Sequence, residues 1–307
     1  VLDPTLAPDG LVAASVVPLV ARGESVGAIA IGRSAALAGH GDLEVLPVIA
    51  GRAALALDNA RLYAAERSVA ETLQQSLLPQ RLPVVEGLEV AAQYRPGGPG
   101  VDVGGDWYDV LALPDGRVAL VIGDVMGRGV VAASVMGQLR NALRGFALQS
   151  IEPDEALSLL DRLLQSDDEC PLATLFLGVV EAASSTITFA NAGHLPPLVV
   201  GADGAAGWLP TAPDPPLGAA SGARYHQSQA EIAPGSTLVL YTDGLVERRS
   251  EPLDHGLAAL REAASAAVAA SLRGEALCRA LIESFTDSGR EPDDTAILAA
   301  RVGGGQA

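Results

Sequence analysis

Hydrophobic and polar positions follow two different periods along the chain, and the change between them divides the sequence. Residues 42–78 carry apolar side chains at a three–four spacing, which is the period of an amphipathic helix. Residues 88–302 instead contain short runs of β-branched and aliphatic residues, separated by turns rich in Gly, Pro and Asp. This pattern predicts a long helix followed by a domain of strands and helices.

Two strand-like runs precede the helix, at residues 11–20 and 25–31. Residues 21–24 lie between them and include a glycine, so the two runs are predicted to form a hairpin. The chain begins at Val1 rather than at a methionine, and it is therefore expected to be a fragment of a longer protein.

The helix predicted over residues 42–78 is interpreted as a linker between two domains. Asp42 is its expected N-cap, and prolines follow its end. Its otherwise polar second half keeps a narrow apolar stripe, made of Leu62, Val69, Leu73 and Leu77. A second copy of the chain would bury such a stripe, so parallel dimerisation is expected. Two separate helices, each packed on its own domain, are the alternative.

The C-terminal part contains blocks of strands and blocks of helices. Strand-like runs lie at 88–94, 110–113, 118–123, 173–181, 186–190, 198–200, 226–232, 237–242 and 295–302. Helical stretches lie at 130–148, 153–165, 253–272 and 275–285. This order predicts an α+β fold with sheets in the middle and helices outside.

Composition narrows the classes of function. The chain has 307 residues, 49% of them hydrophobic, and a formal net charge of −17, so it can build large cores and is a poor partner for nucleic acid. No apolar run reaches the roughly 18 residues of a membrane span. The two cysteines, Cys170 and Cys278, have no metal-binding spacing, which favours a reducing, cytoplasmic compartment.

Two residue types are informative because they are scarce. The sequence contains no lysine, which excludes a P-loop lysine, a Schiff-base lysine and the lysine beside a phospho-aspartate. The four histidines form no zinc-binding pattern. A metal site in this chain would therefore use oxygen ligands, which favours Mg²⁺ or Mn²⁺.

Acidic residues recur where strand-like runs begin or end. They occur in GGDWYD (Asp106, Asp109), IGDVMGRG (Asp124), LYTDGLVE (Asp243) and EPDDTAIL (Asp293, Asp294). Any one of them alone would more often be a turn residue. If they converge, their repulsion requires a compensating cation, and two divalent ions about 3.5–4 Å apart could bind phosphate oxygens.

These motifs resemble those of the PP2C-like metal-dependent serine/threonine phosphatases, in the bacterial branch of SpoIIE and the RsbU-type stress phosphatases. The motifs VGGDWYDV, VIGDVMGRG, FANAGHLPP, LYTDGLVE and DDTAIL occur in the order of that family, over about residues 88–302. The resemblance implies an αββα sandwich, two Mn²⁺ or Mg²⁺ ions and a hydroxide nucleophile instead of a protein nucleophile.

The resemblance also implies roles for individual residues. Asp124 would bridge both metals, and the backbone carbonyl of Val125 and the carboxylate of Asp106 would belong to the first metal site. Asp243 and Asp293 would bind the second metal. Asp294 is the alternative to its neighbour, because the family carries an adjacent DN or DD pair and uses its first member.

One position departs from the family pattern. Many relatives carry GHG where this chain has Gly127, Arg128 and Gly129. An imidazole could protonate the leaving serine oxygen, whereas a guanidinium cannot release a proton near pH 7. Either another water or acid does that job, or Arg128 only binds phosphate charge. His194, in NAGH, is interpreted as structural.

The resemblance predicts three parts: the C-terminal part of a GAF-like sensor domain (1–61), a linker helix (62–84) and a phosphatase domain (85–303). The implied activity removes phosphate from serine or threonine of a protein, by analogy an anti-sigma-factor antagonist of STAS type. A metal-binding scaffold that has lost efficient chemistry is the alternative, and Arg128 is the feature in its favour. A phospho-aspartate phosphatase is disfavoured by the absence of lysine.

Overall fold

A computed structural model describes residues 11–34, 45–97, 104–166, 171–248, 251–285 and 293–303. The chain divides into two compact units, Val1–Ser68 and Val69–Ala307. The expected N-cap Asp42 lies outside the described residues. Among the helices that the structure describes, none combines the length and the apolar character needed to cross a bilayer.

The first unit contains the predicted hairpin and most of the long helix. Strands β1 (Leu11–Ala21) and β2 (Glu24–Ser34) pair antiparallel around a turn at Arg22 and Gly23, both with positive φ. Helix α1 (Leu46–Leu77) is one helix of 32 residues. Its small side chains Ala50 and Ala54 are buried against the strands, so a local core holds the helix to the hairpin.

The second unit is a sandwich of two five-stranded antiparallel sheets. The first sheet has the order β10-β7-β6-β5-β4 and the second has the order β3-β12-β11-β8-β9. The first comprises β4 (Asp106–Ala112), β5 (Val118–Val125), β6 (Ala173–Glu181), β7 (Thr186–Ala192) and β10 (Ser228–Glu231). The second comprises β3 (Leu88–Arg95), β8 (Leu198–Val200), β9 (Ala206–Trp208), β11 (Thr237–Tyr241) and β12 (Thr295–Val302).

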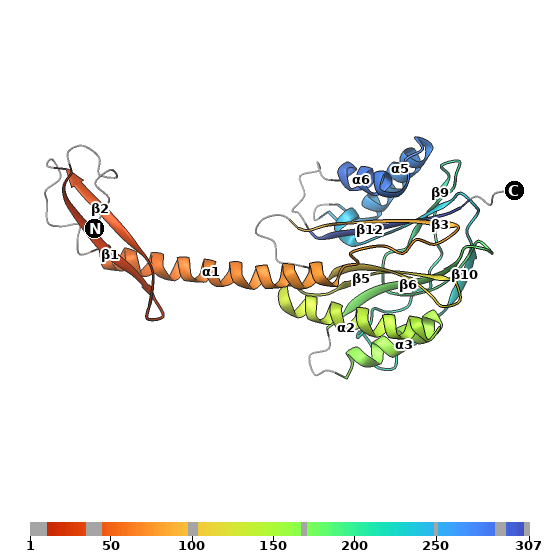
Figure 1. Ribbon diagram of the computed structural model, residues 1–307, viewed down its shortest axis with the longest axis horizontal. Coiled ribbons are helices and arrows are strands. Elements are labelled where there is room, and N and C mark those ends of the chain that lie inside the picture. The colour runs from red at the N-terminus through yellow and green to blue at the C-terminus, as the bar shows by residue number, and fades with distance from the viewer. Residues whose placement is uncertain are drawn as a thin grey trace. The chain divides into compact units, whose positions relative to one another are not determined.

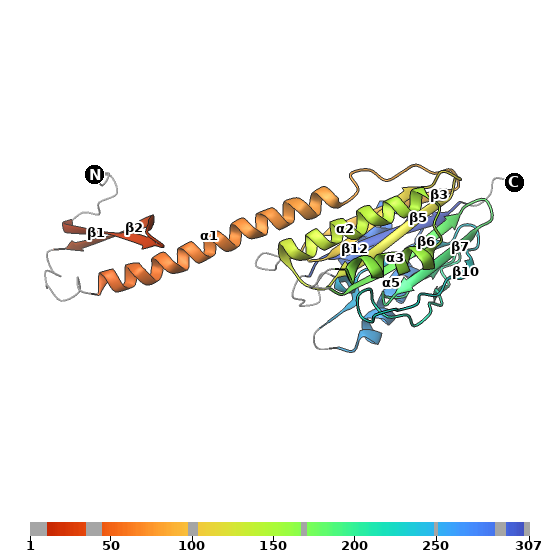
Figure 2. The same cartoon turned by 90° about the horizontal axis from the view of Figure 1, so that it is seen from below.

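Helices cover the outer face of each sheet, which gives four layers (Figures 1 and 2). Helices α2 (Gly129–Leu148) and α3 (Pro153–Leu164) lie on the first sheet, and α5 (Leu253–Ala269) and α6 (Gly274–Ser284) on the second. The prediction of an α+β fold with central sheets and outer helices is confirmed.

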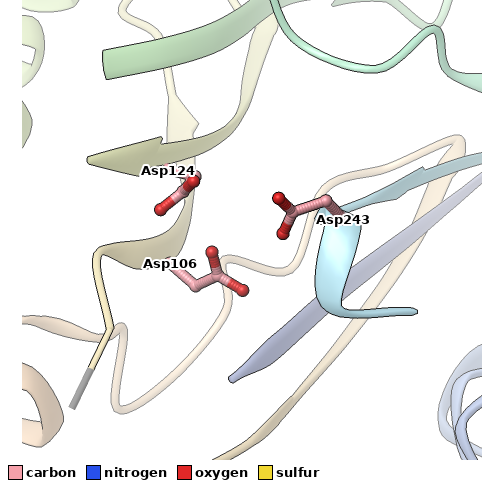
Figure 3. Close-up of side chains that lie close together, drawn as sticks. All are labelled: Asp106, Asp124 and Asp243. Carbon is pink, nitrogen blue, oxygen red and sulfur yellow. The ribbon is translucent and has the colours of Figure 1, made fainter. Parts of the chain in front are cut away.

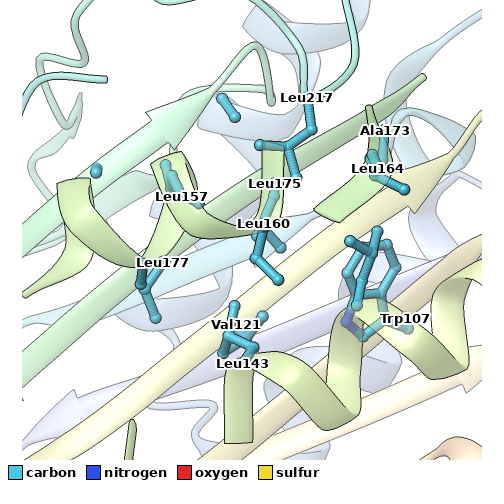
Figure 4. Close-up of a cluster of buried hydrophobic side chains, with 14 of the residues drawn as sticks. Trp107, Val121, Leu143, Leu157, Leu160, Leu164, Ala173, Leu175, Leu177 and Leu217 are labelled. Carbon is cyan, nitrogen blue, oxygen red and sulfur yellow. The ribbon is translucent and has the colours of Figure 1, made fainter. Parts of the chain in front are cut away.

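Strand β5 shows why its sequence is continuously apolar. Ala119 and Val121 face the helices α2 and α3, whereas Leu120 and Ile122 face the space between the two sheets. Figure 4 shows the helix side of this arrangement, with Leu143 of α2 near Val121. Each fully buried Val, Leu or Ile side chain contributes roughly 1.5–3 kcal/mol relative to an exposed one. Burial on both faces therefore fixes β5 firmly, and with it the acid that ends the strand.

Three local expectations need correction. Strand β4 begins at Asp106 and not at residue 110, because Trp107 and Tyr108 are buried on its two faces and pair with β5. The short strand β9 and the one-turn helix α4 (Asp243–Val246) were not predicted. Both are too short to show a hydrophobic period, so only the tertiary structure reveals them.

Candidate metal centre

Strands β4 and β5 place two of the predicted acids directly opposite each other. Asp106 begins β4, and its Cα partner in the antiparallel register is Asp124 near the end of β5. The backbone N–H of Val125 donates to the carbonyl of Gly105 at 3.2 Å. A Cβ on Gly105 would overlap the backbone of Val125, so this close approach requires glycine.

The third acid comes from the other sheet. Asp243 is the first residue of α4, and only Thr242 separates it from the end of β11. The turn is fixed to β12, since the backbone N–H of Ala296 donates to Oγ1 of Thr242 at 2.9 Å. A Cβ on Gly244 would overlap the backbone carbonyl of Asp294. The glycine of the TDG motif therefore lets α4 lie against the start of β12.

Carboxylate oxygens of Asp106, Asp124 and Asp243 lie within 4.8 Å of one another. Figure 3 shows the three side chains around a shared space, two from the first sheet and one from α4. Asp106 is buried, and the other two are half-buried. The folded chain thus brings together acids that are up to 137 positions apart in sequence (243 − 106).

Burial and mutual repulsion disfavour the charged forms of these acids. Burial is the largest cause in each case. Burial, followed by the charges of Asp124 and Asp243, raises the pKa of Asp106 well above its usual range. Burial together with the charge of Asp243 raises the pKa of Asp124 to about 7. The pKa of Asp243 is also raised, by burial and by the charge of Glu247.

A cation fits this site. Oδ2 of Asp106 is buried and accepts no hydrogen bond from the part of the chain that the structure describes. Three crowded carboxylates with such an orphaned oxygen are costly to bury unless a positive charge compensates them. An all-oxygen donor set favours Mg²⁺ or Mn²⁺ over zinc.

The two adjacent acids of the DDTAIL motif have different surroundings. Asp293 is exposed, and its charge contributes to the raised pKa values of Asp124 and Asp243. Asp294 is buried and accepts hydrogen bonds from the backbone N–H groups of Gly97 and Gly104. Neither belongs to the group of three acids within 4.8 Å, and Asp293 is the exposed member of the pair.

Arg128 lies at the turn between β5 and α2. Gly127 and Gly129, on either side of it, have positive φ values of 115° and 75°, which explains the two glycines of the MGRG motif. Arg128 is the N-cap residue of α2, its side chain makes no capping hydrogen bond, and it is exposed. The guanidinium is thus a solvent-facing cation four residues beyond Asp124.

Asp109, the second acid of GGDWYD, does not join the cluster. Its Oδ2 lies 3.0 Å from Nε of both Arg140 and Arg144, on helix α2. Burial raises the pKa of Asp109, and the two guanidinium groups oppose that shift. This acid is therefore part of an ion-pair network that fastens α2 to β4.

His194 holds the two sheets together near the cluster. Its Nδ1 lies 2.8 Å from Oγ1 of Thr174 on β6, and its Nε2 lies 3.2 Å from the carbonyl oxygen of Tyr241 on β11. The carbonyl can only accept, so Nε2 carries the proton and Nδ1 accepts from the hydroxyl. Burial lowers the pKa of His194 to about 4, so the ring is neutral near pH 7. The structural interpretation of this histidine is supported.

Two polar residues near the cluster were missed from the sequence. Tyr94 of β3 has a buried hydroxyl, and its pKa is raised by burial and by the charges of Asp294 and Asp106. Gln74 of α1 is buried and donates to the carbonyl of Gly104 at 3.2 Å. No motif marks either residue, because only the packing of α1 and β3 brings them to the acids.

The chain is similar in sequence to known proteins. The family described as Stage II sporulation protein E (SpoIIE) matches residues 114–303. Protein IcfG of Synechocystis is 29% identical over 206 residues, which cover 58% of this chain and 32% of that protein. Phosphoserine phosphatase RsbU of Bacillus subtilis is 27% identical over 187 residues, 61% of this chain and 55% of that one. The chain thus spans between about a third and about half of these curated relatives.

Solved structures share the fold. The RsbU and RsbW domains of Rv1364c from Mycobacterium tuberculosis match with 34% identity and a TM-score of 0.65, over 74% of this chain and 63% of that one. The PP2C phosphatase domain of SpoIIE from Bacillus subtilis matches with 20% identity and a TM-score of 0.59, over 71% and 64%. The second of these likenesses concerns the fold alone.

Removing one charge from the cluster is expected to have opposite effects with and without metal. In EDTA, Asp106→Asn relieves repulsion and raises the melting temperature by about 2–4 °C per kcal/mol gained. With excess Mn²⁺ the wild-type chain gains more stability than the variant, because the amide is a poorer ligand. Thermal unfolding of both proteins in both buffers measures this. A melting temperature of Asp106→Asn below that of the wild-type chain in EDTA would contradict the repulsion among the three carboxylates.

Proposed function

The chain belongs to the SpoIIE family, and from this membership we propose that its second unit is a metal-dependent phosphatase acting on phosphoserine or phosphothreonine of a protein. The observation that carries the proposal is the meeting of Asp106, Asp124 and Asp243 within 4.8 Å, with one buried oxygen unpaired. Two relatives from Bacillus subtilis, RsbU and RsbP, are named phosphoserine phosphatases, which supports this choice of substrate.

The residues that would hold two ions follow from the cluster and its neighbours. Asp124 would contact both ions, and Asp106 and the backbone carbonyl of Val125 would belong to the first site. Asp243 and the exposed Asp293 would hold the second. Bound Mn²⁺ or Mg²⁺ would supply a water of lowered pKa and neutralise phosphate charge. A structural neighbour, RsbX, crystallised with magnesium, has the same fold at 18% identity.

The chain's own residues limit how the leaving group can be protonated. Hydrolysis breaks the bond between phosphorus and the serine oxygen, adds water and leaves that oxygen in need of a proton. His194 cannot deliver it, because both ring nitrogens are engaged and the ring is buried. A guanidinium group is not a proton donor in general acid catalysis either. We therefore assign the proton to solvent and give Arg128 the role of binding the phosphoryl oxygens.

The first test replaces the acid shared by both sites. Asp124→Asn is expected to lower Mn²⁺-dependent hydrolysis of p-nitrophenyl phosphate by more than about 100-fold while the chain stays folded. Asp203→Asn, at an exposed turn between β8 and β9, is the matched control and should leave turnover unchanged. Wild-type turnover in Asp124→Asn would refute the mechanism. Calorimetry that finds bound ions but no turnover in the wild-type chain would indicate the scaffold instead.

The second test addresses Arg128. Arg128→Ala is expected to raise KM for a phosphoprotein substrate by about tenfold, with a smaller change in kcat, because a charge-assisted contact to the phosphate is lost. Arg128→Lys should restore part of the affinity, since a point charge remains. Steady-state kinetics of the three proteins separates KM from kcat. An unchanged KM would exclude Arg128 from phosphate binding.

We further propose that the chain dimerises through α1. Val48, Leu55, Leu62 and Val69 recur every seven residues, and each is about half exposed, from 48% to 62%. Residues that recur every seven positions occupy the same position of successive coiled-coil heptads, so the four side chains form one stripe that a second helix could cover. Leu77, which was also assigned to the stripe, is half-buried and packs against Gly137 of α2 instead.

Dimerisation is tested by placing a charge on this repeat. Leu62→Glu is expected to shift the chain from dimer to monomer, because two carboxylates would face each other across the interface. Arg61→Ala, on the neighbouring exposed position, is the control and should stay dimeric. Sedimentation equilibrium at micromolar concentration measures the mass. A wild-type monomer would overturn the proposal.

The proposal also covers the identity of the first unit and of the physiological substrate. Residues 1–61 are assigned to the C-terminal part of a GAF-like sensor and residues 62–84 to a linker, on the strength of the sequence resemblance. The substrate assigned on the same ground is a STAS-type antagonist of an anti-sigma factor. Dephosphorylation of such a protein would place the chain in the control of transcription.

A further inference from the structure

Asp294 is a buried carboxylate whose oxygens are already occupied by the protein. Its side chain is 3% exposed. Oδ1 accepts a hydrogen bond from the backbone N–H of Gly97 at 2.5 Å, and Oδ2 accepts one from the backbone N–H of Gly104. The two glycines lie on the segment that leads from β3 to Asp106. The side chain of Asp294 therefore binds both Gly97 and Gly104, and Gly104 lies two residues before the proposed metal ligand Asp106.

Gln74 of helix α1 completes the contact. It is 2% exposed, and its Nε2 donates to the carbonyl of Gly104 at 3.2 Å and lies 3.5 Å from Oδ2 of Asp294. Both backbone groups of Gly104 are thus hydrogen-bonded: its N–H donates to Asp294, and its carbonyl accepts from Gln74. Both of these buried polar side chains therefore have hydrogen-bond partners.

The backbone of Asp294 touches the other half of the site. Its carbonyl lies so close to Gly244 that a Cβ there would overlap it, and Gly244 directly follows Asp243. Its neighbour along the chain is Asp293. Asp294 consequently contacts, by side chain or backbone, each of the segments that carry Asp106, Asp243 and Asp293.

We propose that Asp294 and Gln74 are positioning residues of the metal centre, and that Asp294 is not a metal ligand. They form a clamp that sets the distance between the acid-bearing segments of the two sheets. The inference rests on the proposed function, since it concerns the same site. Groups that orient ligands without touching the metal alter metal affinity by about 10- to 100-fold when they are removed.

Calorimetric titration of the full chain with Mn²⁺ distinguishes a clamp from a ligand. Asp294→Asn keeps the shape but presents an N–H group to one backbone donor. It is expected to bind as many ions as the wild-type chain, with an affinity about 10- to 100-fold weaker. Asp293→Asn is the ligand comparison and is expected to bind one ion fewer. If Asp294→Asn also loses one ion, Asp294 is a ligand and the proposal is overturned.

Stability without metal gives a second readout with a defined sign. In EDTA, Asp294→Asn should lower the melting temperature, on the order of 5 °C, because buried N–H groups lose their acceptor. Asp293→Asn should leave it unchanged or raise it, because a repelling charge is removed. Gln74→Leu should lower both stability and Mn²⁺ affinity, by less than Asp294→Asn. A melting temperature of Asp294→Asn equal to or above that of the wild-type chain would overturn the clamp.

A matched control separates positioning from general loss of a buried carboxylate. Asp161 of α3 is also 2% exposed, and it accepts hydrogen bonds from the backbone N–H of Gly218 and the hydroxyl of Tyr225. Asp161→Asn should lower the melting temperature and leave Mn²⁺ affinity unchanged. An equal loss of affinity in Asp161→Asn would show a global effect and refute the clamp. A wild-type chain that takes up no Mn²⁺ would refute the proposed function, while the stability comparison would still test the clamp.

Discussion

The repulsion among Asp106, Asp124 and Asp243 is the constraint on which the rest of the second unit depends. Three carboxylates within 4.8 Å, one of them fully buried, oppose the folding that brings them together. The cores between the sheets and beneath the helices must supply enough apolar burial to hold them in place. A divalent cation bound among the three carboxylates, as proposed, would offset this cost through its positive charge.

Within each sheet, backbone contacts next to the site leave no room for side chains. Gly105 lies against Val125 within the first sheet, and Gly244 lies against Asp294 in the second. His194 connects the two sheets, because its ring contacts Thr174 of β6 and Tyr241 of β11. Short contacts of this kind fix distances between acids better than long side chains could, and a metal site needs such fixed distances.

Charged residues in the same motifs take on different physical roles. Asp106 and Asp109 are three residues apart in GGDWYD, yet the first faces the acid cluster and the second pairs with Arg140 and Arg144. The adjacent Asp293 and Asp294 differ in the same way, one exposed and one buried among N–H donors. The two members of each pair have the same chemistry, and they differ in their surroundings.

The sequence by itself determined the elements with a clear period and the segments that carry the acids. The apolar runs of β5, β6 and β12 predict buried strands, and the motifs predict Asp106, Asp124 and Asp243 as neighbours. Only the tertiary structure decided what depends on distant contacts: that β4 begins at Asp106, and that Gln74 and Tyr94 lie beside the site. Local periodicity shows which face of an element is buried, but it does not show which distant segment covers that face.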